Sequence, residues 1–196
     1  MLNVKTHEER ILYRGAHPLR VRSSGNNRLI YEDCTSFNFQ CDIRQLDLEN
    51  SDHRQDLIVT TFNERFPRLA PKGDLVAYST DQFGPRRVVV RPYPETASDL
   101  QQVPIDYCDQ SAWDKAGHRL YVVCMSGTFE VPVSLSPFKL GEPRRLFSKG
   151  RAHFMWLYSS TRDQFLTIKQ TNLRNTAIVA FNWFEELDRM MAGSAR

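Results

Sequence analysis

Cysteine and histidine are the residue types of this chain that could hold a metal ion or act as a nucleophile or base. The four cysteines are Cys34, Cys41, Cys108 and Cys124, and none of them shows the C-x-x-C spacing of a structural zinc site. A zinc site would have to recruit scattered histidines, so we predict neither a metal nor a cofactor. Cys34 and Cys41 could face each other across a hairpin, but cysteines are also common as small buried hydrophobic residues, and we expect free thiols.

The histidines are too widely spaced to define a catalytic or metal-binding set; they are His7, His17, His53, His118 and His153. His118 in the turn "DKAGHRL" and His53 in the polar loop "ENSDHRQD" are expected to be exposed. His153 opens "AHFMWLY", the predicted innermost strand of the last repeat, where it could line a channel. We therefore assign no catalytic, cofactor-binding or metal residue.

No kinase or hydrolase signature is present. The chain has no glycine-rich phosphate loop, no strand lysine and no H-R-D catalytic loop of a kinase. The stretch "DQFGP" at 81–85 is expected to be a hairpin rather than a D-F-G motif. Neither "CMSGTF" nor "RSSGNN" is a G-x-S-x-G nucleophile elbow. We expect no enzyme activity. The arginine pairs Arg86–Arg87 and Arg144–Arg145 could bind an acidic ligand, although charges on outer strands usually protect sheet edges.

Composition indicates an ordinary soluble globular chain of 196 residues, with 41% hydrophobic and 25% charged residues. A net charge of +3 is far below the concentrated positive patch of a nucleic-acid-binding protein. The longest apolar run, "LYVVCM" at 120–125, is too short to span a membrane, and the N-terminal residues contain no signal-peptide core. We predict neither nucleic-acid binding nor a membrane span.

An internal repeat is the most informative feature of the sequence. Four stretches share a turn followed by an apolar strand: "RVRSSGNNRLIYED", "PRLAPKGDLVAYST", "SAWDKAGHRLYVVC" and "LYSSTRDQFLTIKQ". Their apolar cores begin at Arg28, Leu75, Leu120 and Phe165, at spacings of 47, 45 and 45 residues. We expect Leu75 with Ala77, Leu120 with Val122, and the Leu29 and Phe165 regions to lie in buried strands.

Further strand-like runs complete each repeat. A second strand follows each core, in "CDIRQLDLE", "RRVVVRPYP", "GTFEVPVSL" and "TAIVAFNW", and the outer strand candidates are "ILYRG", "LIVTT", "LQQVP" and "RRLFS". Four short strands in about 45 residues match one blade of a β-propeller. We predict an all-β fold of four blades at 9–55, 56–98, 99–142 and 143–182, after an N-terminal tail, 1–8. A β-sandwich with hairpins at accidental spacing is the alternative.

The turns between the first two strands of each blade fit this prediction. In "SSGN" and "PKGD", Gly25 and Gly73 stand where a left-handed residue is needed. The third copy, "DKAG", moves its glycine to Gly117, and the fourth, "STRD", has none.

The stretch "LAPKGDLVAYST" resembles the TolB-like, WD40-like (PD40-type) repeats of β-propellers. "VVVRPYPE" at 88–95, "VPVSLSPFKLGEPRRLF" at 131–147 and the closing "FNWFEEL" resemble the C-terminal sensor propellers of bacterial serine/threonine kinases. The resemblance implies a non-catalytic sensor or protein-interaction module that binds a protein or small ligand at its loops or channel. The alternative is an accessory lid or specificity domain of a peptidase-type hydrolase. The chain would be cytoplasmic by default, or extracytoplasmic within a membrane-anchored kinase.

The last residues, 183–196, are predicted to form a short helix and tail. Asn182 is a good N-cap, Glu185 occupies the capping-box position, and Trp183 would pack against the last blade. A partner-binding helix is the alternative.

The two ends of the repeat array are complementary, because "RILYRG" at 10–15 could pair with residues 176–182 and close a ring. Four blades are few for a closed propeller, so we expect an open arc instead. Such an arc would leave two apolar blade faces exposed and would self-associate.

Overall fold

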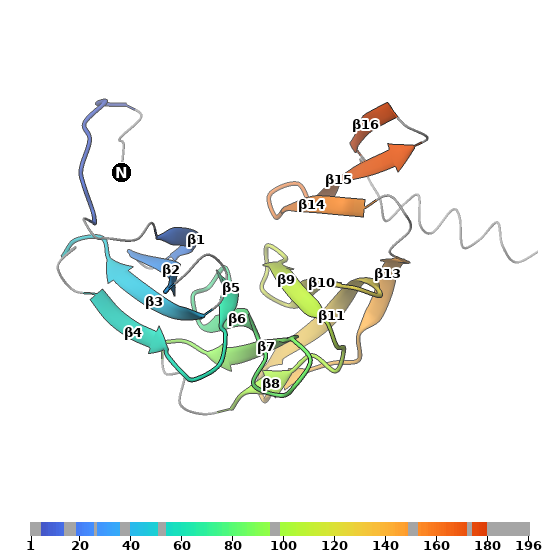
Figure 1. Cartoon of the computed structure of the whole chain (residues 1–196), viewed down its shortest axis with the longest axis horizontal. Coiled ribbons are helices and arrows are strands. Elements are labelled where there is room, and N and C mark those ends of the chain that lie inside the picture. Colours follow the sequence, from blue (N-terminus) through green and yellow to red (C-terminus); the bar gives the residue numbers. More distant parts are fainter. Residues whose placement is uncertain are drawn as a thin grey trace, which may run out of the picture.

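The structure of the chain is a computed structural model (Figure 1). It describes residues 5–13, 19–25, 27–35, 40–50, 54–94, 99–148, 153–171 and 174–179, and for residues 153–157, 167–171 and 174–179 it describes the backbone alone. The predicted C-terminal helix, with Asn182, Trp183 and Glu185, lies outside the described residues, as do His17 and His53.

The described residues form sixteen strands in four antiparallel sheets. The first sheet has the order β1-β2-β3-β4, with bounds Arg20–Gly25, Arg28–Cys34, Cys41–Asp47 and Arg54–Ile58. The second has the order β5-β6-β7-β8, with bounds Arg65–Leu69, Leu75–Thr80, Arg87–Pro92 and Gln101–Gln102. No helix in this part of the chain is long and apolar enough to cross a membrane.

The other two sheets repeat the plan with small changes. In the third, β9, β10 and β11 are Cys108–Trp113, Arg119–Cys124 and Gly127–Leu135, and β11 also pairs with β12 and β13, which are Phe138–Leu140 and Arg144–Ser148. The fourth sheet has the order β14-β15-β16, with bounds His153–Ser159, Gln164–Thr171 and Arg174–Val179.

The four sheets follow one another along an arc (Figure 1). The first strands of neighbouring sheets, β1 with β5 and β5 with β9, lie in contact and form the inner side of the arc. Each sheet is therefore one blade whose first strand is innermost, and the predicted all-β fold of four blades is confirmed.

The outer strands complete the sheet that precedes them. β4 pairs with β3, β8 with β7 and β13 with β11, because an antiparallel strand reached by a short connection pairs with its predecessor. The sheets thus span 20–58, 65–102, 108–148 and 153–179. The repeat units counted from the sequence place the same outer strands at the start of the next unit, which shifts each boundary by one strand.

Hydrophobic residues fill the space between neighbouring sheets. One group, which includes Ile30, Ile43, Val76 and Tyr78, joins the first and second sheets, and a larger group joins the second and third. Tyr121, Leu146 and Phe165 join the third and fourth.

The predicted burial of the repeat cores is confirmed at Leu75, Ala77, Leu120, Val122 and Phe165. In the first sheet Leu29 is only partly buried, because its side chain points away from the second sheet, and Ile30 fills the core instead.

Left-handed residues precede the second strand of each sheet. They are Asn27 (φ 59°), Gly73 (φ 68°), Gly117 (φ 75°) and Asp163 (φ 51°). Gly73 therefore has the predicted conformation, whereas Gly25 ends β1. Asparagine and aspartate tolerate this conformation better than other side chains, which explains why the first and fourth turns need no glycine.

The third turn is fixed by a buried carboxylate. Asp114 Oδ1 accepts hydrogen bonds from the backbone N–H of His118 (2.8 Å) and of Arg119 (3.0 Å), and Asp114 Oδ2 accepts one from Arg119 Nε (3.2 Å). These bonds hold the chain reversal between β9 and β10.

The cysteines are paired in two disulfides, Cys34–Cys41 and Cys108–Cys124, so the expectation of free thiols is wrong. Both pairs are direct cross-strand neighbours, in β2–β3 and in β9–β10. Cross-strand neighbours bring their Cβ atoms to about the 4 Å separation that a disulfide requires. The hairpin between Cys34 and Cys41 was recognisable in the sequence; the second pair depends on a register that includes a bulge.

The face of the first sheet that points away from the second sheet carries a group of charged side chains. Arg44, on β3, forms ion pairs with Asp33, Asp42 and Asp56, and Arg54 also reaches Asp33. Alternation places Leu29, Tyr31 and Asp33 on this face, opposite the core residue Ile30.

The N-terminal segment also lies at the first sheet. Arg10 Nη2 donates to the backbone oxygen of Glu49 (3.1 Å), and the Arg54 guanidinium lies 4.9 Å from the ring centre of Tyr13. Among the described residues, β16 pairs with β15 and with no other strand.

Candidate ligand-binding face

The inner strands β1 and β5 are joined by hydrogen bonds that involve side chains. The backbone N–H of Leu69 donates to Ser23 Oγ (3.1 Å), and the Arg68 guanidinium donates to the backbone oxygen of Arg22. On the other side of β5, Trp113 Nε1 of β9 donates to the backbone oxygen of Arg68 (3.0 Å). These contacts place the side chains of β1 and β5 at one site on the inner side of the arc.

Glu32 is the acidic centre of this site and is fully buried. Arg22 forms a two-point ion pair with it, with Nε–Oε1 at 3.0 Å and Nη2–Oε2 at 3.1 Å. The backbone N–H of Phe66 donates to Oε1 (2.6 Å), and Arg20 lies 4.0 Å from Oε2. The two-point geometry fixes the guanidinium and the carboxylate relative to each other.

Phe66 has an unusual backbone conformation, with φ at 55°, inside an irregular part of β5. Its ring contacts two cations, because the Arg22 and Arg65 guanidiniums are 4.9 and 4.7 Å from its centre. A bulky residue with positive φ is rare and is often found where function imposes the conformation.

The inner arginine cluster consists of Arg20, Arg22, Arg65 and Arg68. Within the described part of the chain, Arg65 and Arg68 form no ion pair with a carboxylate; Arg68 donates to the backbone oxygens of Arg22 and Pro67, and Arg65 Nε is buried without an acceptor. Burial lowers the pKa of Arg65 and of Arg68, and the neighbouring arginines lower it further, while Glu32 opposes the shift. The cluster therefore carries excess positive charge.

The rim next to the cluster is formed by loops from three sheets, which are joined by hydrogen bonds. The N–H of Cys41 donates to Asn63 Oδ1 (3.2 Å), that of Asn63 to Asp81 Oδ1 (2.9 Å), and that of Cys108 to the backbone oxygen of Arg86 (3.0 Å). The N–H of Met125 donates to the backbone oxygen of Tyr107 (2.9 Å). The two disulfides lie on this rim, one within the β2–β3 pair and one within the β9–β10 pair.

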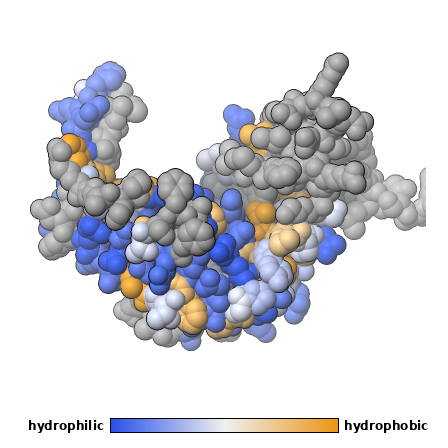
Figure 2. All heavy atoms as spheres, viewed as in Figure 1, coloured by the Kyte–Doolittle hydropathy of each residue, from blue (hydrophilic) through white to orange (hydrophobic). Residues whose placement is uncertain are grey.

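The rim also exposes large hydrophobic side chains. Tyr107 is 56% exposed and Met125 is 63% exposed, and Tyr107 has a positive φ of 56°. Phe62 and Val59 are exposed on the loop before β5. In Figure 2 the visible described surface is mostly hydrophilic, with hydrophobic residues in small separate groups.

Glu64 is a second buried carboxylate of the rim. Its Oε1 accepts hydrogen bonds from the hydroxyls of Thr60 (2.7 Å) and Thr80 (3.3 Å), while Oε2 is buried without a partner. Burial raises the pKa of Glu64, and the nearby carboxylates of Asp42 and Asp81 raise it further, against the two hydroxyl hydrogen bonds.

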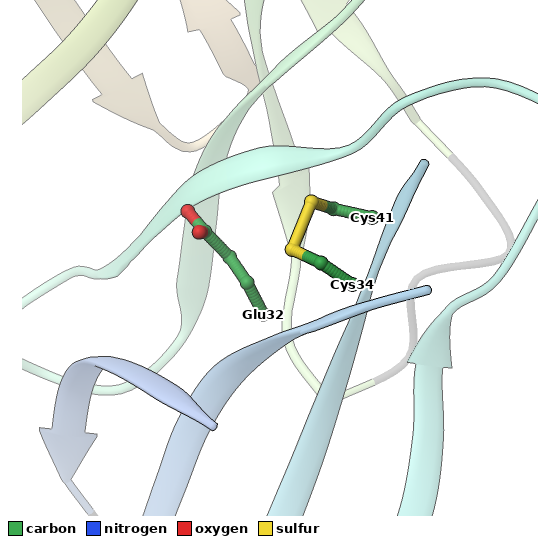
Figure 3. Close-up of side chains that lie close together, drawn as sticks. All are labelled: Glu32, Cys34 and Cys41. Atoms are coloured by element: carbon green, nitrogen blue, oxygen red, sulfur yellow. A yellow bond between two sulfur atoms is a disulfide. The ribbon is translucent and has the colours of Figure 1, made fainter. Parts of the chain in front are cut away.

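Three side chains of metal-binding types lie close together in the described residues, namely Glu32, Cys34 and Cys41, with ligand atoms within 4.8 Å of one another (Figure 3). The two sulfur atoms are bonded to each other, and Glu32 is held by Arg22. These atoms form a disulfide beside an ion pair, and they do not offer a free donor set for a metal.

The residues considered from the sequence are spread over the molecule. His7 and His118 are exposed, as expected for His118, and His153 opens β14, where only its backbone is described. Arg86 and Arg87 pair with Asp109 and Asp106. They lie next to or in β7, which is the third strand of its sheet, between β6 and β8, and is not the outer strand.

Arg144, on the outer strand β13, pairs with Glu130, and Arg145 lies over the Phe129 ring. The sequence reasoning did not find the inner arginine cluster. The recurrence of arginine in "RVR" and "RFPR", at the start of two successive inner strands, was the available signal.

No family model and no curated protein matches the chain at a significant level. Solved structures do match. TolB from Acinetobacter baumannii aligns with a TM-score of 0.60 at 11% identity, over 89% of this chain and 43% of that one. An oligogalacturonate lyase in complex with manganese aligns with a TM-score of 0.62 at 11% identity, over 93% and 54%. The β-propeller domain of the Trilobed protease from Pyrococcus furiosus aligns with a TM-score of 0.51 at 11% identity, over 83% and 57%.

At these identities the likeness shows the fold, which is that of TolB-like β-propellers. The predicted resemblance to TolB-like repeats is confirmed at this level, and the resemblance to kinase-linked propellers stays a prediction. The chain spans about half the length of these TolB-like structures, the oligogalacturonate lyase and the Trilobed protease propeller, and 29% of the Pyrococcus horikoshii acylaminoacyl peptidase.

Proposed function

We propose that the chain is a non-catalytic β-propeller module for protein interaction or sensing, and that it acts as the C-terminal part of a larger TolB-like or kinase-linked propeller. The observation that carries the proposal is the inner side of the arc, where β1 and β5 present excess positive charge next to exposed hydrophobic residues of the rim. Charge with adjacent exposed hydrophobic residues is typical of a binding surface.

The chemistry of the site favours binding over catalysis. Glu32 is held by charged and backbone donors, and Glu64 is buried with only hydroxyl donors, so neither is placed to take a proton from a substrate. The two disulfides support an oxidising compartment, so we place the module outside the cytoplasm.

A second candidate function is that of an accessory lid or specificity domain in a peptidase-type system. The observation in its favour is the fold likeness to peptidases with propellers, such as the Pyrococcus horikoshii acylaminoacyl peptidase, with a TM-score of 0.54 at 14% identity. A neighbouring gene for a peptidase would favour this candidate, whereas one for a kinase or transporter would favour the first.

Selection from a phage-displayed random peptide library tests the interaction role. We expect the purified chain to enrich peptides that also bind in solution, and we expect binding to weaken in a Tyr107→Ser, Met125→Ser double variant. Leu166→Ser is the matched control, because Leu166 is an exposed hydrophobic residue on β15, away from the rim. Failure to enrich any peptide, or hydrolysis or phosphorylation of substrates by the chain alone, would contradict the proposal.

A further inference from the structure

The inner arginine cluster is incompletely neutralised. The oxygens of Glu32 are already occupied by Arg22, by the N–H of Phe66 and, at longer range, by Arg20. Arg65 and Arg68 are left without a carboxylate among the described residues, and Arg65 Nε is buried with no acceptor. A partly buried cation without an anionic partner is costly, and a bound anion would remove that cost.

Carboxylate is an anion that this arrangement already accommodates. The Arg22–Glu32 pair shows that a two-point guanidinium–carboxylate contact is formed at this site. Arginine presents its donors in a planar fork that matches a carboxylate, and stacking on the Phe66 ring keeps the Arg65 guanidinium in place.

The surroundings favour a polypeptide as the source of the carboxylate. Tyr107 and Met125 are exposed on the rim, next to Cys108, whose N–H donates to the backbone oxygen of Arg86. β9 begins at Cys108 and contacts β5, which carries Arg65 and Arg68, so the rim residues and the cluster belong to adjoining strands. Phe66 in the cluster and Tyr107 on the rim both have a positive φ, which is unusual for bulky residues.

We propose that the inner arginine cluster binds the carboxylates of an acidic segment of a partner protein, with Arg65 and Arg68 as the contacting cations and Tyr107 and Met125 in contact with apolar residues of the same segment. This inference rests on the proposed role as an interaction module. It adds the chemistry of the partner, which has acidic and apolar residues in one segment.

The experiment uses a fluorescently labelled peptide of alternating glutamate and leucine, and fluorescence anisotropy with the full chain at low salt. We expect saturable binding that weakens with added salt, and a loss of at least about tenfold in affinity for Arg65→Gln and for Arg68→Gln. Arg162→Gln is the matched control, because Arg162 is exposed in the turn between β14 and β15, and it should bind like the parent chain. Circular dichroism and urea unfolding verify that each variant is folded.

Four results overturn the inference: equal binding of a peptide with glutamine in place of glutamate, unchanged affinity in a folded Arg65→Gln variant, equal loss in Arg162→Gln, or no binding of the acidic peptide. Inorganic phosphate serves as a competitor. If phosphate binds at the cluster and the peptide does not, the ligand of the cluster is a small anion and not a partner protein. Library peptides that need Tyr107 and Met125 but tolerate Arg65→Gln would keep the interaction role and remove the arginine site. This result separates failure of the inference from failure of the proposed function.

Discussion

Two buried glutamates show how local partners decide what a carboxylate does in this protein. Glu32 is held by the guanidinium of Arg22 and by a backbone N–H, so it organises the inner strands. Glu64 has two hydroxyl donors and one oxygen without a partner, and it lies near Asp42 and Asp81. Burial therefore disfavours the charged form of Glu64.

Replacement of Glu64 by glutamine should stabilise the protein at neutral and alkaline pH. Because burial raises the pKa of Glu64 above its ordinary value of 4.5, the native protein keeps a proton that the unfolded chain releases, and stability falls as the pH rises from 4.5 through the native pKa. Glu64→Gln removes this loss and keeps an acceptor for Thr60. We expect a gain of about 1–3 kcal/mol in the free energy of unfolding at about pH 8, and no comparable gain at about pH 4.

Urea unfolding at both pH values measures this difference. Glu8→Gln is the control, because Glu8 is exposed and should give the same small change at either pH. A loss of stability at alkaline pH in Glu64→Gln would show that the charged carboxylate is the form that the fold uses.

Asp114 is expected to contribute to stability through the turn that it holds. Asp114→Ala removes the acceptor of two backbone N–H groups and of Arg119 Nε, so we expect a loss of about 2–3 kcal/mol in the free energy of unfolding. Asp114→Asn keeps one oxygen and should lose less. Lys115→Ala, at an exposed neighbouring position, should change the urea midpoint little, and an equal effect of the two alanine variants would refute this role.

At the residue scale, the sequence predicted which side chains are buried better than it predicted which side chains they contact. The alternation around Leu75 and Leu120 correctly placed these side chains in the core. It could not predict that Arg22 and Arg65 both contact the Phe66 ring, because the contact with Arg22 joins strands about 45 residues apart and depends on a bulge in β1 and in β5. A bulge interrupts the two-residue alternation of side chains, so the contacts that depend on it cannot be predicted from that alternation.

At the scale of elements, each disulfide fixes one hairpin or strand pair of the rim. Cys34 and Cys41 close the β2–β3 hairpin over 7 residues of separation, and Cys108 and Cys124 join β9 to β10 over 16. The longer closure restricts the unfolded chain more, so the second disulfide should contribute more to stability.

A Cys108→Ser, Cys124→Ser double variant tests this contribution. We expect the free energy of unfolding to fall by about 3 kcal/mol, and by less in Cys34→Ser, Cys41→Ser. Peptide mapping without reductant should recover both linked pairs from the parent chain. Four reactive thiols in the unfolded, unreduced protein would show that the cysteines are not paired.

The strands were more predictable than their grouping. The cores of β2, β6, β10 and β15 follow from hydrophobic alternation, and the turns before them follow from residues that accept a positive φ. Whether β4, β8 and β13 end one sheet or begin the next depends on pairing between segments, which the repeat period alone does not determine. β8, within the predicted strand "LQQVP", is only two residues long.

At the scale of the whole molecule, the first sheet ends the described arc with a face that is not simply apolar. The face that points away from the second sheet carries Arg44 and Arg54 with three aspartates. TolB from Acinetobacter baumannii and the oligogalacturonate lyase are both about twice as long as this chain. A partner blade at the first sheet would have to match these charges, and that contact would weaken with salt.

Closure of the ring by the N-terminal segment is the remaining question at this scale, and Ile11 tests it. Residues 10–13 lie beside the first sheet, through Arg10 and Tyr13, so we expect β16 to keep a free edge in an open arc. Ile11→Pro should then change the free energy of unfolding by less than about 0.5 kcal/mol and leave amide exchange in residues 174–179 unchanged, because Ile11 is 59% exposed and pairs with no strand in the described structure. Ile178→Pro, inside β16, is the positive control and should accelerate exchange there. If Ile11→Pro also accelerated it, the N-terminal segment would be the outer strand of the last blade, and the molecule would be a closed ring.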